Sequence, residues 1–446
     1  MNVLLVSTCR EREPEPVFPL GCTYLLAALK NAGQSVSFLD LMAEEAGEDD
    51  VKKKVSDARP GLVAVSIRNL ENFNFPLNLS YVPNHVATIA AIRSATDAPI
   101  IVGGGGFAVA PEAFLAATGA DAGVVGEGEE ILPALATTVE KQGRLPDAMK
   151  NAVIRAPLIE DLDTVPPDRT TAVQDFYHRE SGCATVQTKR GCNLHCTYCD
   201  YPLIEGARVR MRNVDLVAEE ILRVQKDSGV DDFMLVDSIF NNPESHAVQF
   251  CEALIRKNVR IRWTGYFKPA FRDPAFFELL ARSGCSGIDA TPDSLSEKTL
   301  RSLGKDFDPG DVERFCARAS KNDLAVNLNF IFGAPGEDED TLKETFARIE
   351  AISPKSVICA IGIRLYPGAG LTKTLKEKQA AVLSEGGLYP TVYISEHVAD
   401  TLVETVERVA RGDSRWVVPG LGVRYNPRLV SRMRKHGKTG PIWKYL

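Results

Sequence analysis

Short apolar runs alternate with amphipathic segments through the first third of the chain. The apolar runs predict buried strands over residues 3–6, 35–39, 62–67, 99–102 and 123–125. The amphipathic segments predict helices over residues 21–32, 86–93, 111–117 and 129–139. Strands buried on both faces and separated by helices are typical of a parallel sheet of the Rossmann or flavodoxin type. We therefore expect residues 1–150 to form one doubly wound α/β domain.

The same alternation resumes after a proline-rich stretch, which we assign as a linker over residues 151–182. Six further strands are predicted over residues 184–188, 232–236, 260–264, 287–291, 325–331 and 357–365, with helices between them. Six strands are too few to close an eight-stranded barrel. We therefore expect residues 183–372 to form a partial (β/α)6 barrel, with its chemistry on the loops at the carboxyl ends of the strands.

The remaining stretch, residues 373–446, mixes two helical segments with basic residues, prolines and aromatic side chains. Basic residues among aromatics also occur in nucleic-acid-binding segments, but this run is short and amphipathic. We expect it to form a small C-terminal cap that covers the barrel mouth and shapes a substrate pocket.

Composition narrows the class of protein. Of 446 residues, 44% are hydrophobic and 25% are charged, which is ordinary for a globular chain of two or three domains. The net charge of -7 disfavours nucleic acid as a partner. No apolar run reaches the length of a membrane span, and the first residues lack the basic start of a signal peptide. Together with the unpaired cysteines, this predicts a cytoplasmic protein.

Three of the ten cysteines, Cys192, Cys196 and Cys199, are spaced C-x3-C-x2-C in one short loop. Three thiolates can hold three irons of a [4Fe-4S] cluster and leave the fourth iron open, whereas a closed electron-transfer cluster normally uses four cysteines. A zinc site with His195 as fourth ligand is the alternative, although the loop is tight for a tetrahedron. The other seven cysteines are scattered singly, which disfavours a disulfide framework.

Four consecutive glycines, Gly103, Gly104, Gly105 and Gly106, fall directly after a predicted strand and before a helix. Without β-carbons, this backbone can come close to a large flat or phosphate-bearing ligand at the carboxyl edge of the sheet. The run is not G-x-G-x-x-G, so it gives little support for a dinucleotide. A tight turn is the alternative interpretation.

The cysteine loop resembles the signature of the radical S-adenosylmethionine (SAM) enzymes. Residues 19–29, the glycine run and Gly126-Glu127-Gly128-Glu129 are similar to the N-terminal cobalamin-binding domain of the B12-dependent members of that superfamily. The resemblance covers nearly the whole chain. It implies three cofactors, namely a [4Fe-4S] cluster, SAM and cobalamin, together with sensitivity to oxygen. It also implies an external electron donor such as flavodoxin or ferredoxin.

On the cobalamin side, the resemblance implies that Ser66, Arg68, the four glycines, Gly126 and Glu127 contact the cofactor. The D-x-H-x-x-G motif, whose histidine ligates cobalt in many cobalamin domains, is missing from this sequence. We therefore expect a lower cobalt face without histidine, approached by Arg68. The alternative is that Arg68 only pairs with a carboxylate or solvent.

On the SAM side, the resemblance implies that the cysteine loop chelates SAM through the open iron. Asp237 and Ser238 fall where the family binds the amino group, and Asp293 and Ser294 fall where it binds the ribose or carboxylate. Relatives usually have glycine before the latter pair, where this chain has Pro292. Further expected contacts are Tyr198 at the adenine and Arg364 at a carboxylate of the substrate or of SAM. Arg364 could alternatively form a salt bridge at the barrel mouth, and the same two interpretations apply to Lys305.

The function implied is methyl transfer from SAM through methylcobalamin to an unactivated carbon of a small molecule. Family members that catalyse cyclisation or rearrangement, or that methylate by polar chemistry, are the nearest alternatives. In a different class, the N-terminal domain would be a degenerate module that binds another ligand or a partner. A non-enzymatic iron–sulfur carrier would not need a SAM barrel. The sequence leaves the substrate and the oligomeric state open, with lipids and peptides as further options.

Overall fold

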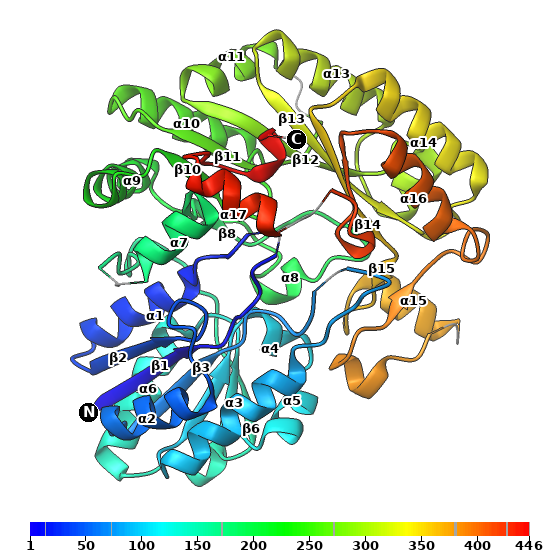
Figure 1. The fold of residues 1–446 in the computed structure, drawn as a ribbon. Coiled ribbons are helices and arrows are strands. Elements are labelled where there is room, and N and C mark those ends of the chain that lie inside the picture. The colour runs from blue at the N-terminus through cyan, green and yellow to red at the C-terminus, as the bar shows by residue number, and fades with distance from the viewer. Residues whose placement is uncertain are drawn as a thin grey trace.

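The structure is a computed structural model that describes residues 1–13, 15–72, 74–170, 173–270, 273–378, 381–424 and 427–445. It contains two sheets of parallel strands, one in each predicted domain (Figure 1). No helix in these ranges is long and apolar enough to cross a membrane.

The N-terminal sheet has the strand order β2-β1-β3-β4-β5-β6, and every pairing in it is parallel. Its strands are β1 (Asn2–Ser7), β2 (Ser35–Asp40), β3 (Leu62–Ser66), β4 (Ile100–Gly103), β5 (Ala122–Val125) and β6 (Ala152–Arg155). The prediction of a doubly wound domain is confirmed. Strand β6 lies within the stretch assigned as linker, so this domain extends to residue 155 rather than 150.

Helices cover both faces of this sheet. One apolar core joins β1 to α1 (Leu20–Asn31) and α6 (Gly128–Gln142). The other core lies under α2 (Glu48–Ala58), α3 (Val82–Ala95), α4 (Gly105–Val109) and α5 (Pro111–Thr118). Apolar residues on both sides of each strand explain why the sequence pattern identified these strands. The same pattern missed α2, whose only buried residues are Val51 and Val55.

The second sheet has the order β17-β14-β13-β12-β11-β10-β7, again with parallel pairings. Its strands are β7 (Ala184–Val186), β10 (Asp232–Leu235), β11 (Arg262–Phe267), β12 (Cys285–Asp293), β13 (Ala325–Phe332), β14 (Ser356–Ile361) and β17 (Trp416–Val417). The first and last strands of this order do not pair, so the barrel is open. The predicted six strands are present, and the C-terminal region adds β17 as a seventh.

Helices follow the barrel strands on the outside (Figure 1). They are α9 (Val214–Ser228), α10 (Glu244–Arg256), α11 (Pro274–Arg282), α12 (Glu297–Ser302), α13 (Pro309–Lys321) and α14 (Glu339–Ile352). Two short ladders lie at the mouth: β8 (Lys189–Arg190) with β9 (Arg210–Met211), and β15 (Ile363–Arg364) with β16 (Val392–Tyr393). The α8 helix (Tyr201–Ile204) follows the cysteine loop, and α7 (Gln174–Ser181), α15 (Gly370–Glu377), α16 (Leu402–Gly412) and α17 (Pro427–Lys435) complete the chain.

The predicted C-terminal cap at the barrel mouth includes β16, which pairs with β15 there, whereas the last residues of the chain lie elsewhere. Trp443 is buried inside the barrel, where its indole nitrogen donates to Asp289 Oδ2 over 3.0 Å. A β-carbon added to Gly287 would lie 2.6 Å from the Trp443 ring, and Lys444 donates to Ser286 over 2.9 Å. These partners lie toward the amino end of β12, away from the mouth. The final segment therefore fills the barrel interior because an open barrel leaves apolar space there.

Replacing Trp443 with Ala should destabilise the protein by about 3–5 kcal/mol, the usual cost of removing a large buried ring. The change empties the space beside Gly287 and removes a hydrogen bond from the buried Asp289. Urea unfolding measures the difference. The matched control is Tyr445→Ala, because Tyr445 is 37% exposed. A loss below about 1 kcal/mol for Trp443→Ala would contradict this placement, since surface changes usually stay within about 0.5 kcal/mol.

Buried ion pairs join the two domains at their carboxyl edges. Arg190 lies 2.7 Å from Glu129 and 3.2 Å from Glu127, and Arg210 lies 2.6 Å from Glu127. A second pair, between Arg364 and Glu71, links the barrel to the loop after β3. The loops that follow both sheets therefore face each other.

Candidate cofactor and substrate site

The three signature cysteines lie together between β8 and α8. Hydrogen bonds shape their loop, with Cys192 N donating to Gly206 O over 3.0 Å and Cys199 N to Cys196 O over 3.3 Å. Gly191 has a φ of +88°, and a β-carbon there would lie 2.2 Å from Arg208 O, so this turn requires glycine. All three cysteines line one cavity of about 550 Å³, the cluster cavity.

The three thiols fit an iron–sulfur cluster better than a single ion. Among the described residues, no three His, Cys, Asp or Glu side chains converge closely enough for one metal ion. The thiols border a cavity instead, which suits a larger group held by three thiolates. Burial raises the pKa of Cys196 and, to about 12, that of Cys199. These two thiols would therefore stay protonated at neutral pH when free, whereas bound iron would hold them as thiolates.

Tyr198, Asp293 and Lys305 form a polar cluster on the wall of the same cavity. The Tyr198 hydroxyl donates to Asp293, and Lys305 Nζ lies 2.5 Å from Asp293 Oδ2 and 3.3 Å from the Tyr198 oxygen. The structure thus brings Tyr198, Asp293 and Lys305 together. Ser294 is the exception, because it is fully buried beside Thr345 and does not line the cavity.

The neighbouring pair Asp237-Ser238 is divided between two roles. Ser238 lines the cluster cavity and donates to Gly191 O over 3.2 Å. Asp237 is buried behind it and accepts hydrogen bonds from Thr188 N, Thr188 Oγ1 and Lys189 N over 2.7, 2.6 and 3.2 Å. These donors occupy the carboxylate that we assigned to the SAM amino group. Asp237 therefore anchors the strand that leads into the cysteine loop.

Arg364 forms the alternative interaction considered from the sequence, a salt bridge. Its Nε donates to Glu71, its Nη1 to Leu365 O over 3.0 Å and its Nη2 to Gly387 O over 2.8 Å. It is buried and does not line the cluster cavity. The expected contact of Arg364 with a SAM carboxylate is therefore replaced by a link between the domains.

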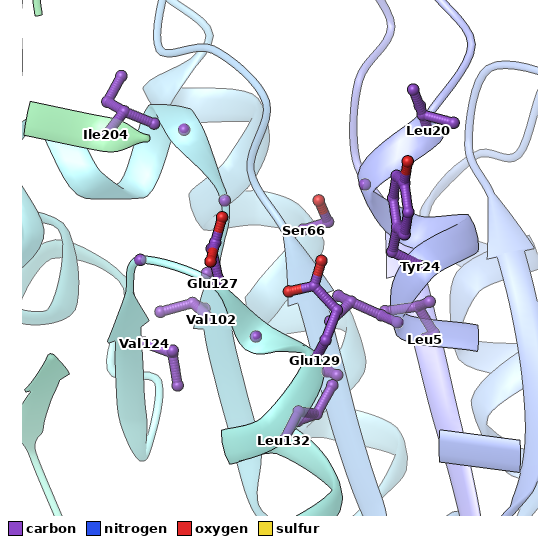
Figure 2. A pocket seen from close by; sticks show the side chains of 18 of the residues that line it. Leu5, Leu20, Tyr24, Ser66, Val102, Val124, Glu127, Glu129, Leu132 and Ile204 are labelled. Carbon is purple, nitrogen blue, oxygen red and sulfur yellow. The ribbon is translucent and has the colours of Figure 1, made fainter. Parts of the chain in front are cut away.

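Two connected cavities lie on the side of the N-terminal domain. The first, the sheet cavity, has about 320 Å³ at the carboxyl ends of β1, β3, β4 and β5. Figure 2 shows its wall, with Tyr24, Ser66, Glu127 and Glu129 around the space. The second, the interdomain cavity, has about 470 Å³ and reaches α8 of the barrel. Both are lined by Leu20, Gly21, Ser66, Gly104, Gly105 and Ile204.

The glycine run serves two purposes. Gly104 has a φ of +98°, and β-carbons added to Gly104 and Gly106 would lie 2.6 Å from Ile67 O and 2.8 Å from Asn69 N. Both residues therefore let two backbone segments pack. A β-carbon at Gly105 would meet nothing closer than 3.6 Å, and this residue lines both cavities. Gly105 is thus the position that leaves space for a ligand, while Gly103 supports the sheet beside Val124 O.

Glu127 and Arg68 differ in whether their charged groups are already paired with neighbouring residues. Glu127 accepts hydrogen bonds from Arg190, Arg210 and Ile159 N. Burial by itself would raise the pKa of Glu127, but the hydrogen bonds from Arg210 and Ile159 lower it. It works as a clamp between the domains, next to Gly126 at a φ of +99°. Arg68 lines the interdomain cavity and donates to Cys9 Sγ over 3.7 Å, and it has no carboxylate within ion-pair distance among the described residues.

Sequence reasoning missed Arg190, Glu71 and two tyrosines of the cluster cavity, Tyr201 and Tyr266. Arg190 had a local signal, because a cation directly precedes the glycine that opens the cysteine loop. Glu71 and Tyr266 had none, since their partners come from distant segments.

Comparison with known proteins gives one family match for each of the two domains. The family model "B12 binding domain" matches residues 14–136, and "Radical SAM superfamily" matches residues 186–349. A tryptophan 2-C-methyltransferase of Streptomyces laurentii is 25% identical over 84% of this chain and 74% of its own. An anaerobic magnesium-protoporphyrin IX monomethyl ester cyclase of Rubrivivax gelatinosus is 25% identical over 74% of this chain and 61% of its own.

The solved structure of the radical SAM methyltransferase TsrM from Kitasatospora setae, with cobalamin and a [4Fe-4S] cluster bound, has a similar fold. It superposes with a TM-score of 0.87 over 100% of this chain and 97% of its own, at 24% identity. The predicted fold class is therefore confirmed. With a B12-binding domain and a radical SAM domain that contains the three-cysteine loop, the chain belongs to the cobalamin-dependent radical SAM enzymes.

Proposed function

We propose that the protein is a methyltransferase that uses SAM and cobalamin to methylate a carbon atom of a small molecule. One observation carries this proposal. The interdomain cavity, on the B12-binding side, and the cluster cavity, which holds the three cysteines, meet at Tyr201. A substrate at this junction would touch both cofactor sites. The relatives include a tryptophan C-methyltransferase, which supports methyl transfer to carbon.

The cofactors would be held by residues already described. Cys192, Cys196 and Cys199 would hold the cluster, with Ser238, Tyr198 and the Asp293–Lys305 pair on the wall where SAM would lie. Ser66, Gly105 and Arg68 would border cobalamin, because all three line the interdomain cavity. When bound, cobalamin supplies a methyl carrier and the cluster supplies single electrons.

The protein's own contribution is placement and shielding. The ion pairs of Arg190 and Arg210 with Glu127 hold the cofactor domain against the barrel. Asp237 fixes Thr188 and Lys189, and with them the chain just before the cysteine loop. Positioning reactants in a closed site can contribute a large share of a rate enhancement.

Two further attributes belong to this proposal. An external donor such as flavodoxin or ferredoxin would supply the electrons, and nucleic acid is not expected to bind. All ten cysteines are free of disulfides, which suits a reducing compartment such as the cytoplasm.

The test is to load the protein with iron, sulfide and hydroxocobalamin under anaerobic conditions and then count the products of SAM. We expect about four irons and one cobalamin per chain, with S-adenosylhomocysteine formed in proportion to a methylated product. Iron without cobalamin would contradict the proposal and favour a module that binds something else.

Cyclisation is the second candidate, because a magnesium-protoporphyrin ester cyclase is among the relatives. It predicts 5'-deoxyadenosine without S-adenosylhomocysteine. The ratio of these two products therefore separates the candidates, and 5'-deoxyadenosine formed together with S-adenosylhomocysteine would indicate radical rather than polar methylation.

A further inference from the structure

Two tyrosine rings have large accessible surfaces although they line an interior cavity. Tyr201, in α8, is 42% exposed, and Tyr266, in β11, is 39% exposed. Both line the cluster cavity. Tyr266 belongs to β11, an inner strand of the barrel sheet, and burial raises its pKa to about 12. A molecule bound in the cavity would therefore cover the exposed surface of these two side chains.

The position of Tyr201 identifies which molecule this would be. Tyr201 lines the cluster cavity and also the interdomain cavity, to which Arg68 and Gly105 belong. A compound in contact with Tyr201 therefore lies between the two cofactor sites. This is the place that a methyl acceptor must occupy, because the methyl source and the acceptor carbon have to meet there.

The two rings are neighbours without touching. They line the same cavity from different elements, Tyr201 from α8 and Tyr266 from β11. No ring contact joins them, whereas rings in the barrel core do pack, such as Phe240 against Trp263 with centroids 4.9 Å apart. Aromatic rings gain stability from offset or edge-to-face contact with another ring. A ring bound in this cavity would offer each tyrosine such a contact.

Both hydroxyl groups are also available. In the part of the chain that the structure describes, neither hydroxyl donates or accepts a hydrogen bond. A tyrosine in the interior usually finds a partner for its hydroxyl group. The missing partner at both positions is consistent with a ligand that supplies a polar atom next to its ring.

We propose that Tyr201 and Tyr266 bind a planar aromatic ring of the methyl acceptor between them and direct a polar substituent of that ring with their hydroxyl groups. This inference rests on the proposed function and narrows its substrate class from small molecules to planar aromatic compounds. The two tyrosines determine specificity and position the acceptor. They take no part in the chemistry of the cofactors.

The test compares two probes that differ only in their ring, 3-phenylpropionate and 3-cyclohexylpropionate. Each is titrated into the enzyme loaded with cluster and cobalamin, and saturation-transfer NMR gives its Kd. We expect the flat phenyl probe to bind about tenfold more tightly than the puckered cyclohexyl probe. Tyr201→Leu and Tyr266→Leu should each reduce this ratio to about two or less, because a leucine packs equally well against both rings.

Tyr445→Leu is the matched control, because Tyr445 is 37% exposed but lies at the chain end, outside these cavities. It should keep the full ratio. Equal affinities in the native enzyme, no binding of the phenyl probe, or a ratio unchanged in both leucine variants would each overturn the inference. Iron and cobalamin are measured on every variant. If a leucine variant loses a cofactor, the methionine variant at the same position is tested instead. A failure of the proposed function would appear separately, as missing cobalamin or missing S-adenosylhomocysteine.

Discussion

Changing Cys192, Cys196 and Cys199 together to Ala is expected to reduce bound iron from about four atoms per chain to none and to abolish the visible absorbance of the cluster. The three thiols lie on one loop around one cavity, and the described residues there include no other cysteine that could replace them. SAM cleavage and methyl transfer should be lost together with the iron. Iron and sulfide analysis with visible spectroscopy on the reconstituted protein measures the change.

The control removes the same number of cysteines elsewhere. Cys251, Cys316 and Cys359 lie in the barrel core and do not reach the cluster cavity. Their triple Ala variant should retain its iron. Cobalamin binding should survive in the variant that lacks the signature cysteines, because the sheet cavity is lined largely by the N-terminal domain. Iron retained without the signature cysteines would refute the site.

Replacing Gly105 with Trp is expected to weaken cobalamin binding by roughly 100-fold or more, a loss of about 2.7 kcal/mol. The new ring would project into the space that the sheet and interdomain cavities share, since nothing lies within 3.6 Å of the β-carbon position. Gly105 has no positive φ, so the backbone accepts the substitution. Cobalamin retained after desalting, read from its absorbance, measures the effect, and bound iron should not change.

Two other glycines make this experiment specific. Gly412 also has open space around its β-carbon position but lies outside the cavities, so Gly412→Trp should leave cobalamin binding intact. Gly104→Ala should instead destabilise the N-terminal domain, because it combines a φ of +98° with a β-carbon 2.6 Å from Ile67 O. Undiminished cobalamin retention in Gly105→Trp would show that the ligand does not pass this point.

The strands of both sheets were predictable because burial on two faces leaves a continuous apolar run in the sequence. Two strands, β6 and β17, were not predicted because they lack such an apolar run. Strand β6 is only partly buried, with the sequence Ala-Val-Ile-Arg, and β17 contains only Trp416 and Val417. Neither is long or apolar enough to stand out from a loop, and both become strands because a sheet edge offers them hydrogen-bonding partners.

The candidate site divides in a similar way. The cysteine spacing is a local property, so Cys192, Cys196 and Cys199 could be assigned from the sequence and then found around one cavity. Asp237 and Arg364 were assigned from their positions at strand ends, yet their charges are taken up by Thr188 and Glu71. A buried carboxylate or guanidinium takes the nearest partner, and that partner is known only from the fold.

The sequence by itself therefore determined the two α/β layers, the order of the domains and the cluster loop, because each depends on neighbours within a few residues. Only the tertiary structure decided that Gly105 borders open cavity space while Gly104 serves packing, that Trp443 fills the barrel, and that Tyr201 lines both the interdomain and the cluster cavity. These outcomes depend on contacts between segments far apart in the chain, whose approach is set by how the two sheets pack against each other.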